Sequence, residues 1–219
     1  PYVGKLVHEL NWKQLQTLNC NKVLKGFPEA KAEKSNKLLQ LQDVFDIAAA
    51  DPQMRFNIET KIEAENREKS ATPQEFVDAI LPVVRHNKAT SRTTIQSFDW
   101  RSLPLVRKAQ PDISLALLYD ATTWKSGSQW IGDVDYDKLG GDVNKAAKQL
   151  GAEILSPDYK LVTPENVASA HAAGLQVLPW TVNEESDMQA MVDAKVDGLI
   201  TDYPTRGLDV VKKNKLQVL

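Results

Sequence analysis

Phe56-Asn57-Ile58-Glu59-Thr60-Lys61 is the stretch that decides the fold of this 219-residue chain. Its polar and apolar residues alternate, and successive side chains of a strand point to opposite faces, so Asn57, Glu59 and Lys61 share one face. Two interpretations fit. The stretch is an edge strand with a solvated polar face, or its polar face points inward at the mouth of a barrel. Because buried charges need partners, the second predicts that Glu59 holds a cation and Lys61 faces an anion.

The composition excludes several classes of function. The net charge of −2 gives no general attraction to nucleic acid or to an anionic membrane. No apolar run approaches the length of a membrane span. The single cysteine, Cys20, cannot form an internal disulfide, which fits the cytosol and also allows the periplasm. At this length the chain can form one domain with a full core.

Strand and helix patterns alternate after residue 55. The expected strands are 56–61, 94–98, 113–119, 153–155, 176–180 and 198–201. The expected helices between and after them are 72–85, 103–109, 142–150, 163–174, 184–194 and 208–212. Thr72-Pro73-Gln74-Glu75 is a capping box, and Gly151 suits a helix C-terminus. Upstream, residues 1–55 predict only two helices, 12–18 and 41–50, and loops. This alternation predicts an α/β protein with a parallel sheet.

The alternation does not separate a closed (β/α)₈ barrel from an open doubly wound sheet. The chain has no glycine-rich nucleotide-binding motif, which disfavours the nucleotide-binding folds. In a barrel the active site lies at the carboxyl ends of the strands, and polar or aromatic residues stand at all six expected ends: 59–61, 97–99, 119–120, 156–158, 180–183 and 201–202. For Asn183 and Asp202, capping of the following helix is an equally good interpretation.

Four of these strand ends together resemble one family, the glycerophosphodiester phosphodiesterases. The blocks are Phe56-Asn57-Ile58-Glu59-Thr60-Lys61, Gln96-Ser97-Phe98-Asp99, Leu178-Pro179-Trp180-Thr181-Val182-Asn183 and Asp197-Gly198-Leu199-Ile200-Thr201-Asp202-Tyr203-Pro204. They occur in the family's order and at compatible spacing, and the likeness covers most of the chain.

The resemblance implies a (β/α)₈ TIM barrel that hydrolyses glycerophosphodiesters to sn-glycerol 3-phosphate and an alcohol such as choline or ethanolamine. It implies a phosphoric diester hydrolase of glycerol and lipid metabolism that uses a divalent cation, Mg²⁺ or Ca²⁺. Glu59 matches a metal ligand of the family, Lys61 a basic residue facing the phosphate, and Trp180 an aromatic residue lining the substrate pocket. The chemistry agrees, because a hard cation takes oxygen ligands and phosphodiester cleavage needs positive charge near the phosphoryl oxygens.

The chain departs from the family in one respect. The family's catalytic pattern, a His-Arg-Gly followed by a Glu-x-Asp pair and a later His-Asp, does not occur in it. We therefore expect residues 1–219 to be the C-terminal three quarters of the barrel domain, lacking about the first two strands. No catalytic residue is expected in this chain, and it should be inactive as it stands. His8, His86 and His171 lie outside the matching blocks and are not expected to substitute.

Two alternatives remain open at this point. One is a related barrel that cleaves phospholipids, of the phospholipase D or C kind, in which Trp124 and Trp130 would touch lipid. Those tryptophans would otherwise cover the top of the barrel. The other is a non-catalytic barrel that binds a phosphodiester or a protein partner. In every case the expected partner is a small molecule or protein and not a nucleic acid, and the oligomeric state is left open.

Overall fold

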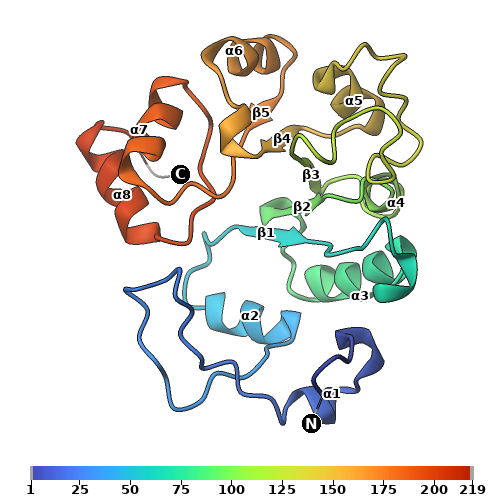
Figure 1. Ribbon diagram of the computed structural model, residues 1–219, viewed down its shortest axis with the longest axis vertical. Helices are drawn as coiled ribbons and strands as arrows, with labels where there is room; N and C mark the ends of the chain where they lie inside the picture. Colours follow the sequence, from blue (N-terminus) through green and yellow to red (C-terminus); the bar gives the residue numbers. More distant parts are fainter. Residues whose placement is uncertain (1, 218–219) are drawn as a thin grey trace.

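A computed structural model describes residues 2–217, which form a five-stranded parallel sheet with helices along its outside (Figure 1). The sheet order follows the sequence, β1-β2-β3-β4-β5. The strands are β1 Phe56–Glu59, β2 Thr93–Ser97, β3 Ser114–Tyr119, β4 Ile154–Pro157 and β5 Gln176–Val177. Each strand is separated from the next by at least one helix, so the predicted βα alternation is confirmed.

The helices follow one another around an arc, and the strands lie inside that arc (Figure 1). After β1 the α-helices are α3 Pro73–His86, α4 Ser102–Ala109, α5 Val143–Leu150, α6 Pro164–Ala172, α7 Glu185–Asp193 and α8 Pro204–Lys213. Short 3₁₀ helices are η1 Val7–Glu9, η2 Arg67–Lys69, η3 Thr90–Arg92 and η4 Tyr159–Leu161. Two predicted boundary signals are confirmed: Thr72 caps α3 reciprocally with Glu75, and Gly151 ends α5 with a φ of 67°.

Residues 2–55 contain no strand, as predicted. They form α1 Trp12–Leu15, α2 Leu41–Ala48 and a long loop between them. In Figure 1 this loop lies between α2 and α8. The Phe27 ring lies 6.3 Å from the Tyr203 ring, and Arg206 of α8 donates to Glu29 at 2.8 Å. The loop is therefore attached to the last helix of the chain.

The predicted strand at 198–201 is not a regular strand, which corrects the expectation of six. Its backbone is nevertheless paired with the extension of β5, because Asp197 N–H bonds the Val177 carbonyl at 3.0 Å and Ile200 N–H bonds the Pro179 carbonyl at 2.9 Å. The extension of β5 itself meets β4 through a bridge between Trp180 and Asp158. Within residues 2–217, β1 pairs only with β2, so the sheet does not close into a ring.

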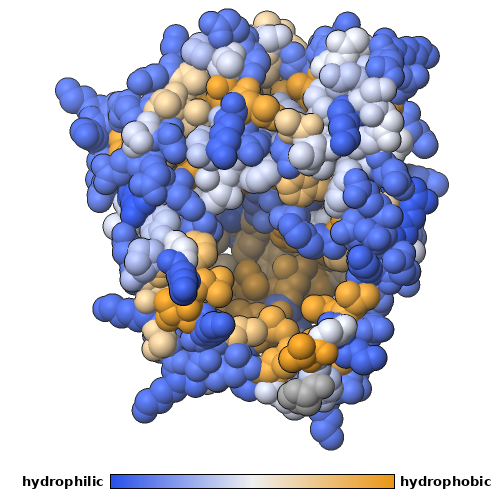
Figure 2. Space-filling view, in the orientation of Figure 1, coloured by the Kyte–Doolittle hydropathy of each residue, from blue (hydrophilic) through white to orange (hydrophobic). Residues whose placement is uncertain are grey.

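The two faces of the sheet have different environments. The main apolar core lies between the sheet and the helices and contains Ile95, Leu115, Leu117, Leu155 and Val177. The opposite face carries the alternate residues of each strand. There the Asn57 amide donates to the Gln96 side chain at 2.8 Å, across β1 and β2. Figure 2 shows a hollow in the middle of the molecule, where Figure 1 places β1, with apolar residues on its floor and along its lower edge and more hydrophilic residues along its upper edge.

No helix within residues 2–217 combines the length and the apolar character needed to cross a membrane.

Candidate active site

Glu59 and Lys61 stand together at the carboxyl end of β1. The Lys61 ammonium lies 3.1 Å from the Glu59 carboxylate. The Glu59 side chain is 29% exposed and the Lys61 side chain 81% exposed, so the carboxylate is sheltered and the ammonium reaches into solvent. β1 is an edge strand within the described residues, yet this end of it lines a cavity. The sequence-based expectation that the two charges share one face is therefore confirmed, although each has the other as its partner.

A hollow of about 350 Å³ surrounds this pair. Its charged lining consists of two carboxylates, Glu59 and Glu63, and two ammonium groups, Lys61 and Lys69. Leu6, from the first residues of the chain, closes one side. A cavity of this size suits a small molecule. The lining therefore presents both carboxylates and ammonium groups to whatever occupies the hollow.

Aromatic rings form the remaining wall of the hollow. Phe98 at the end of β2 and Trp130 from the loop between β3 and α5 both line it, with their rings 6.3 Å apart at 76°. Trp180 packs edge-on against Phe98, with ring centres 5.2 Å apart at 80°. The structure thus brings the predicted Trp180 next to the hollow, in contact with a ring that lines it.

Trp130 is held firmly although it comes from a long loop. Its carbonyl accepts from the Trp100 N–H at 2.8 Å, and its indole N–H donates to the Glu65 carboxylate at 3.2 Å. Trp124 instead packs against Trp100 and Tyr136. Trp124 and Trp130 therefore play different parts: the first supports the loop and the second faces the hollow. Sequence reasoning did not assign Phe98 or Trp130 to the site.

Asp99, at the end of β2, is buried and is used structurally. Its side chain has no exposed surface, and Arg101 holds both carboxylate oxygens through its guanidinium. The neighbouring carboxylate raises the pKa of Arg101. This pair lies where α4 begins, and removing one partner would leave a buried charge unpaired. Asp99 is therefore no free ligand for substrate or metal.

The other polar strand ends also have protein partners. The Ser156 hydroxyl donates to the Leu178 carbonyl at 2.7 Å, and the Asp158 carboxylate caps η4 through the Lys160 N–H at 3.0 Å. The expectation that Asn183 and Asp202 cap helices is wrong, because the N-cap residues of α7 and α8 are Glu184 and Tyr203. Instead the Asn183 amide donates to the Asp202 carboxylate at 2.8 Å, and its oxygen accepts the Asp202 N–H at 3.0 Å.

Asp120 closes the turn that follows β3. Its carboxylate accepts from the Thr122 N–H at 2.7 Å and from the Thr123 N–H at 2.9 Å. Partial burial alone would raise the pKa of the Asp120 carboxyl, but the hydrogen bonds from Thr122 and Thr123 outweigh it and hold the pKa below its ordinary value. Asp120 is therefore a carboxylate that forms the turn after β3.

The histidines lie outside the hollow's lining. The His8 ring bonds the Lys69 carbonyl at 3.0 Å, His86 is the last residue of α3, and His171 of α6 bonds Asp197 at 2.9 Å. Within residues 2–217 no three His, Cys, Asp or Glu side chains come close enough to hold a metal ion. Glu59 can supply one oxygen ligand, but a complete set for Mg²⁺ or Ca²⁺ is not formed by these residues.

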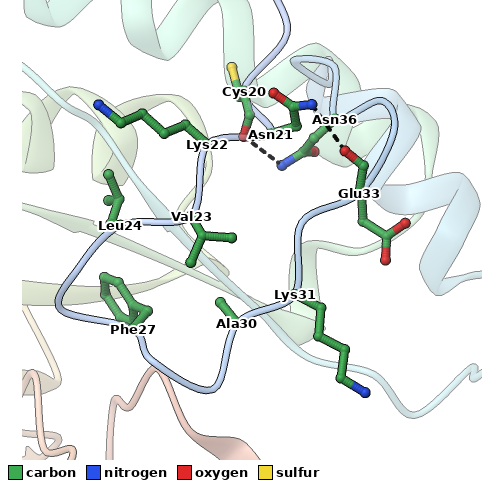
Figure 3. A pocket seen from close by; sticks show the side chains of 10 residues that line it. All are labelled: Cys20, Asn21, Lys22, Val23, Leu24, Phe27, Ala30, Lys31, Glu33 and Asn36. Carbon is green, nitrogen blue, oxygen red and sulfur yellow. Dashed lines mark hydrogen bonds between the residues drawn. The ribbon is translucent and has the colours of Figure 1, made fainter.

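A second hollow, of about 240 Å³, lies within the loop before α2 (Figure 3). All its lining residues fall between Cys20 and Asn36. Two hydrogen bonds close it: the side-chain amide of Asn21 donates to the Glu33 carbonyl, and that of Asn36 donates to the Cys20 carbonyl. Figure 3 shows the Cys20 sulfur pointing away from the hollow. This hollow is the interior of a loop and brings no charged group toward a common centre.

The fold and the site define a class: a parallel barrel-type α/β protein with a carboxylate, an ammonium group and an aromatic wall at the carboxyl ends of its strands. Its sequence matches the glycerophosphoryl diester phosphodiesterase family over residues 2–206. The chain belongs to that family.

Relatives with assigned names agree with the family. The chain is 29% identical over 136 residues to the glycerophosphodiester phosphodiesterase of Caldanaerobacter subterraneus subsp. tengcongensis, a match covering 62% of this chain and 49% of that protein. It is 32% identical over 120 residues to the Bacillus subtilis enzyme of the same name, covering 55% of this chain and 36% of that protein. The matched parts thus span half or less of these two relatives.

Solved structures confirm the fold class. A protein from Silicibacter pomeroyi DSS-3, named for the same family, superimposes with a TM-score of 0.85 at 28% identity and covers 98% of this chain and 72% of its own. An Oleispira antarctica phosphodiesterase, crystallised with the product sn-glycerol 3-phosphate, has a TM-score of 0.60 at 18% identity, covering 78% of this chain and 60% of its own. The five parallel strands are therefore part of a TIM-type barrel that does not close within the described residues.

Proposed function

We propose that these residues bind the substrate in the hydrolysis of glycerophosphodiesters to sn-glycerol 3-phosphate and an alcohol, without themselves supplying the catalytic acid and base. One observation carries the proposal: in a chain of this family, Glu59 and Lys61 come together at a hollow of about 350 Å³ that is walled by Phe98 and Trp130. The presence of sn-glycerol 3-phosphate in the Oleispira antarctica relative supports the choice of ligand. The family match favours this reaction over phospholipid cleavage.

In this proposal each residue has a separate part. Lys61 binds a phosphoryl oxygen, because its ammonium is mostly exposed and reaches the hollow. Glu59 is one ligand of a divalent cation, Mg²⁺ or Ca²⁺, which would supply positive charge near the phosphoryl group. Trp180 stiffens the aromatic wall through Phe98. Because the described residues form no complete metal site, we assign no chemical step to the metal.

Calorimetric titration with sn-glycerol 3-phosphate in the presence of Mg²⁺ or Ca²⁺ tests the proposal. We expect binding by the 219-residue chain and a large loss of affinity in Lys61→Met. Lys148→Met is the matched control, because Lys148 is exposed on α5 and does not line the hollow. Equal affinity in all three proteins would remove Lys61 from the site. No binding by the unaltered chain would refute the proposed ligand for these residues.

A further inference from the structure

Thr60 lies between the two charged residues of the site and points to the opposite side of the strand. Thr60 is only 1% exposed, although its neighbours Glu59 and Lys61 both line the hollow. Its hydroxyl donates to the Ser97 hydroxyl at 2.7 Å and lies 3.1 Å from the Ser102 hydroxyl. Both serines in turn donate to the Asp99 carbonyl, at 2.9 and 3.1 Å. The three hydroxyls therefore form one buried network that joins β1 to the end of β2 and the start of α4.

This network lies at the point where the hydrogen bonds between β1 and β2 end. The last hydrogen bond between β1 and β2 is from the Thr60 N–H to the Gln96 carbonyl at 3.0 Å. The next bond, from the Ile62 N–H back to the Thr60 carbonyl at 3.0 Å, turns the chain away from the sheet, so Lys61 stands at the tip of that turn. Within residues 2–217, β1 has a strand neighbour on one side only.

We propose that Thr60 is a positioning residue, whose buried hydroxyl fixes the backbone turn that places Glu59 and Lys61 at the hollow. The proposal rests on the proposed function for the role of those two residues. Its physical basis is that a site residue placed on a turn keeps a fixed geometry only where supporting hydrogen bonds hold the backbone on which it stands. Thr60 is among the residues that line the hollow, but its hydroxyl is turned to Ser97 and Ser102, so we assign its side chain to holding the turn and not to binding the ligand.

The test compares Thr60→Val, which has the same shape without the hydroxyl, with Thr60→Ser, which keeps the hydroxyl. Thr93→Val is the matched control, because Thr93 is 3% exposed and its hydroxyl donates to the Ala89 carbonyl at 2.8 Å, at the amino end of β2. It removes a comparable buried hydrogen bond at the opposite end of the sheet. Two quantities are measured for each protein: hydrogen exchange of the backbone amides around residue 62, and affinity for sn-glycerol 3-phosphate with Mg²⁺ or Ca²⁺.

We expect Thr60→Val to speed exchange at the turn and to weaken affinity by about tenfold, in line with the loss of outer supporting partners at other sites. Thr60→Ser should restore both quantities. Thr93→Val should lower stability without changing either. Unchanged exchange at residue 62 in Thr60→Val would overturn the proposal, as would an equal effect of Thr93→Val.

The two proposals fail in distinguishable ways. If the unaltered chain does not bind the ligand, the proposed function fails for this chain, and the exchange comparison still decides whether Thr60 fixes the turn. If the ligand binds and Lys61→Met abolishes binding while Thr60→Val has no effect, only the positioning role is wrong.

Discussion

Replacing Trp180 with alanine should destabilise the protein by about 4 kcal/mol and loosen the wall of the hollow. Trp180 is half-buried, its indole N–H donates to the Ser156 carbonyl at 2.8 Å, and its ring meets Phe98 edge-on. The buried half of an indole contributes about 2 kcal/mol. The hydrogen bond adds about 1 kcal/mol, and the aromatic pair adds roughly 0.5–1.5 kcal/mol. The total of about 3.5–4.5 kcal/mol lies within the range of about 3–5 kcal/mol for replacing a buried tryptophan with alanine.

Urea unfolding measures this loss, and Trp180→Phe separates its parts. Phenylalanine keeps the contact with Phe98 and loses the hydrogen bond to Ser156, so it should cost about 1 kcal/mol. Trp180→Ala should also weaken sn-glycerol 3-phosphate binding several-fold, because Phe98 loses its support, whereas Trp180→Phe should retain most of the affinity. A loss below about 1 kcal/mol for Trp180→Ala at an unchanged denaturant slope would refute the assigned packing. Full affinity in Trp180→Ala would refute its part in the wall.

Four further outcomes are expected. Glu59→Gln should lower the affinity for Ca²⁺ or Mg²⁺ while leaving the unfolding midpoint nearly unchanged, and a calorimetric titration identical to that of the unaltered chain would count against Glu59 as a ligand. The 219-residue chain should associate in sedimentation experiments, because among residues 2–217 no strand pairs with the outer edge of β1; a monodisperse monomer would show that this edge is covered. With glycerophosphocholine and Mg²⁺ or Ca²⁺, the chain should show no turnover, assayed beside the Bacillus subtilis glycerophosphodiester phosphodiesterase, since positioned acids and bases typically contribute about 10²–10⁴-fold each; turnover would make His8, His86 and His171 the first residues to replace. Because the pKa of Asp120 is lowered in the folded state, its stabilising contribution should be present above the unfolded pKa and be lost as the pH falls through the folded pKa; Asp120→Asn should flatten this part of the acid unfolding curve.

Most of the fold could be predicted from the sequence because its elements carry local signals. The apolar run at 113–119 and the capping box at Thr72 depend on neighbouring residues alone, and both gave the right elements, β3 and α3. The segment 198–201 has the residue pattern of a strand, but whether it forms a regular ladder depends on what lies beside it. Within the described residues it pairs with the extension of β5 only, through isolated backbone bonds. Sequence pattern could not reveal that difference.

The site could be predicted only in part, because strand alternation places some of its residues and contacts distant in sequence place the others. Glu59 and Lys61 follow from strand alternation, and Phe98 follows the same alternation one strand further, after Thr94 and Gln96. Trp130 has no such signal, because it belongs to a long loop without periodicity. Its position depends on two contacts distant in sequence, with Trp100 and Glu65.

The distribution of hydrogen bonds explains why, of the polar residues at the strand ends, only Glu59 and Lys61 are assigned to ligand binding. A carboxylate or amide whose oxygens already accept protein donors offers little to a ligand, because binding would have to break those bonds first. Asp99 is held by Arg101, Asp120 by two threonines, and Asp202 by Asn183. Among the residues that the structure describes, Glu59 has one side-chain partner, Lys61, whose side chain is long, flexible and mostly exposed. A phosphodiester bound with a cation can satisfy both groups at once, with the carboxylate turning to the cation and the ammonium to the phosphoryl oxygens. The ion pair of Glu59 and Lys61 is therefore the pair of charges at this end of the sheet that a ligand can separate without leaving either one unpaired.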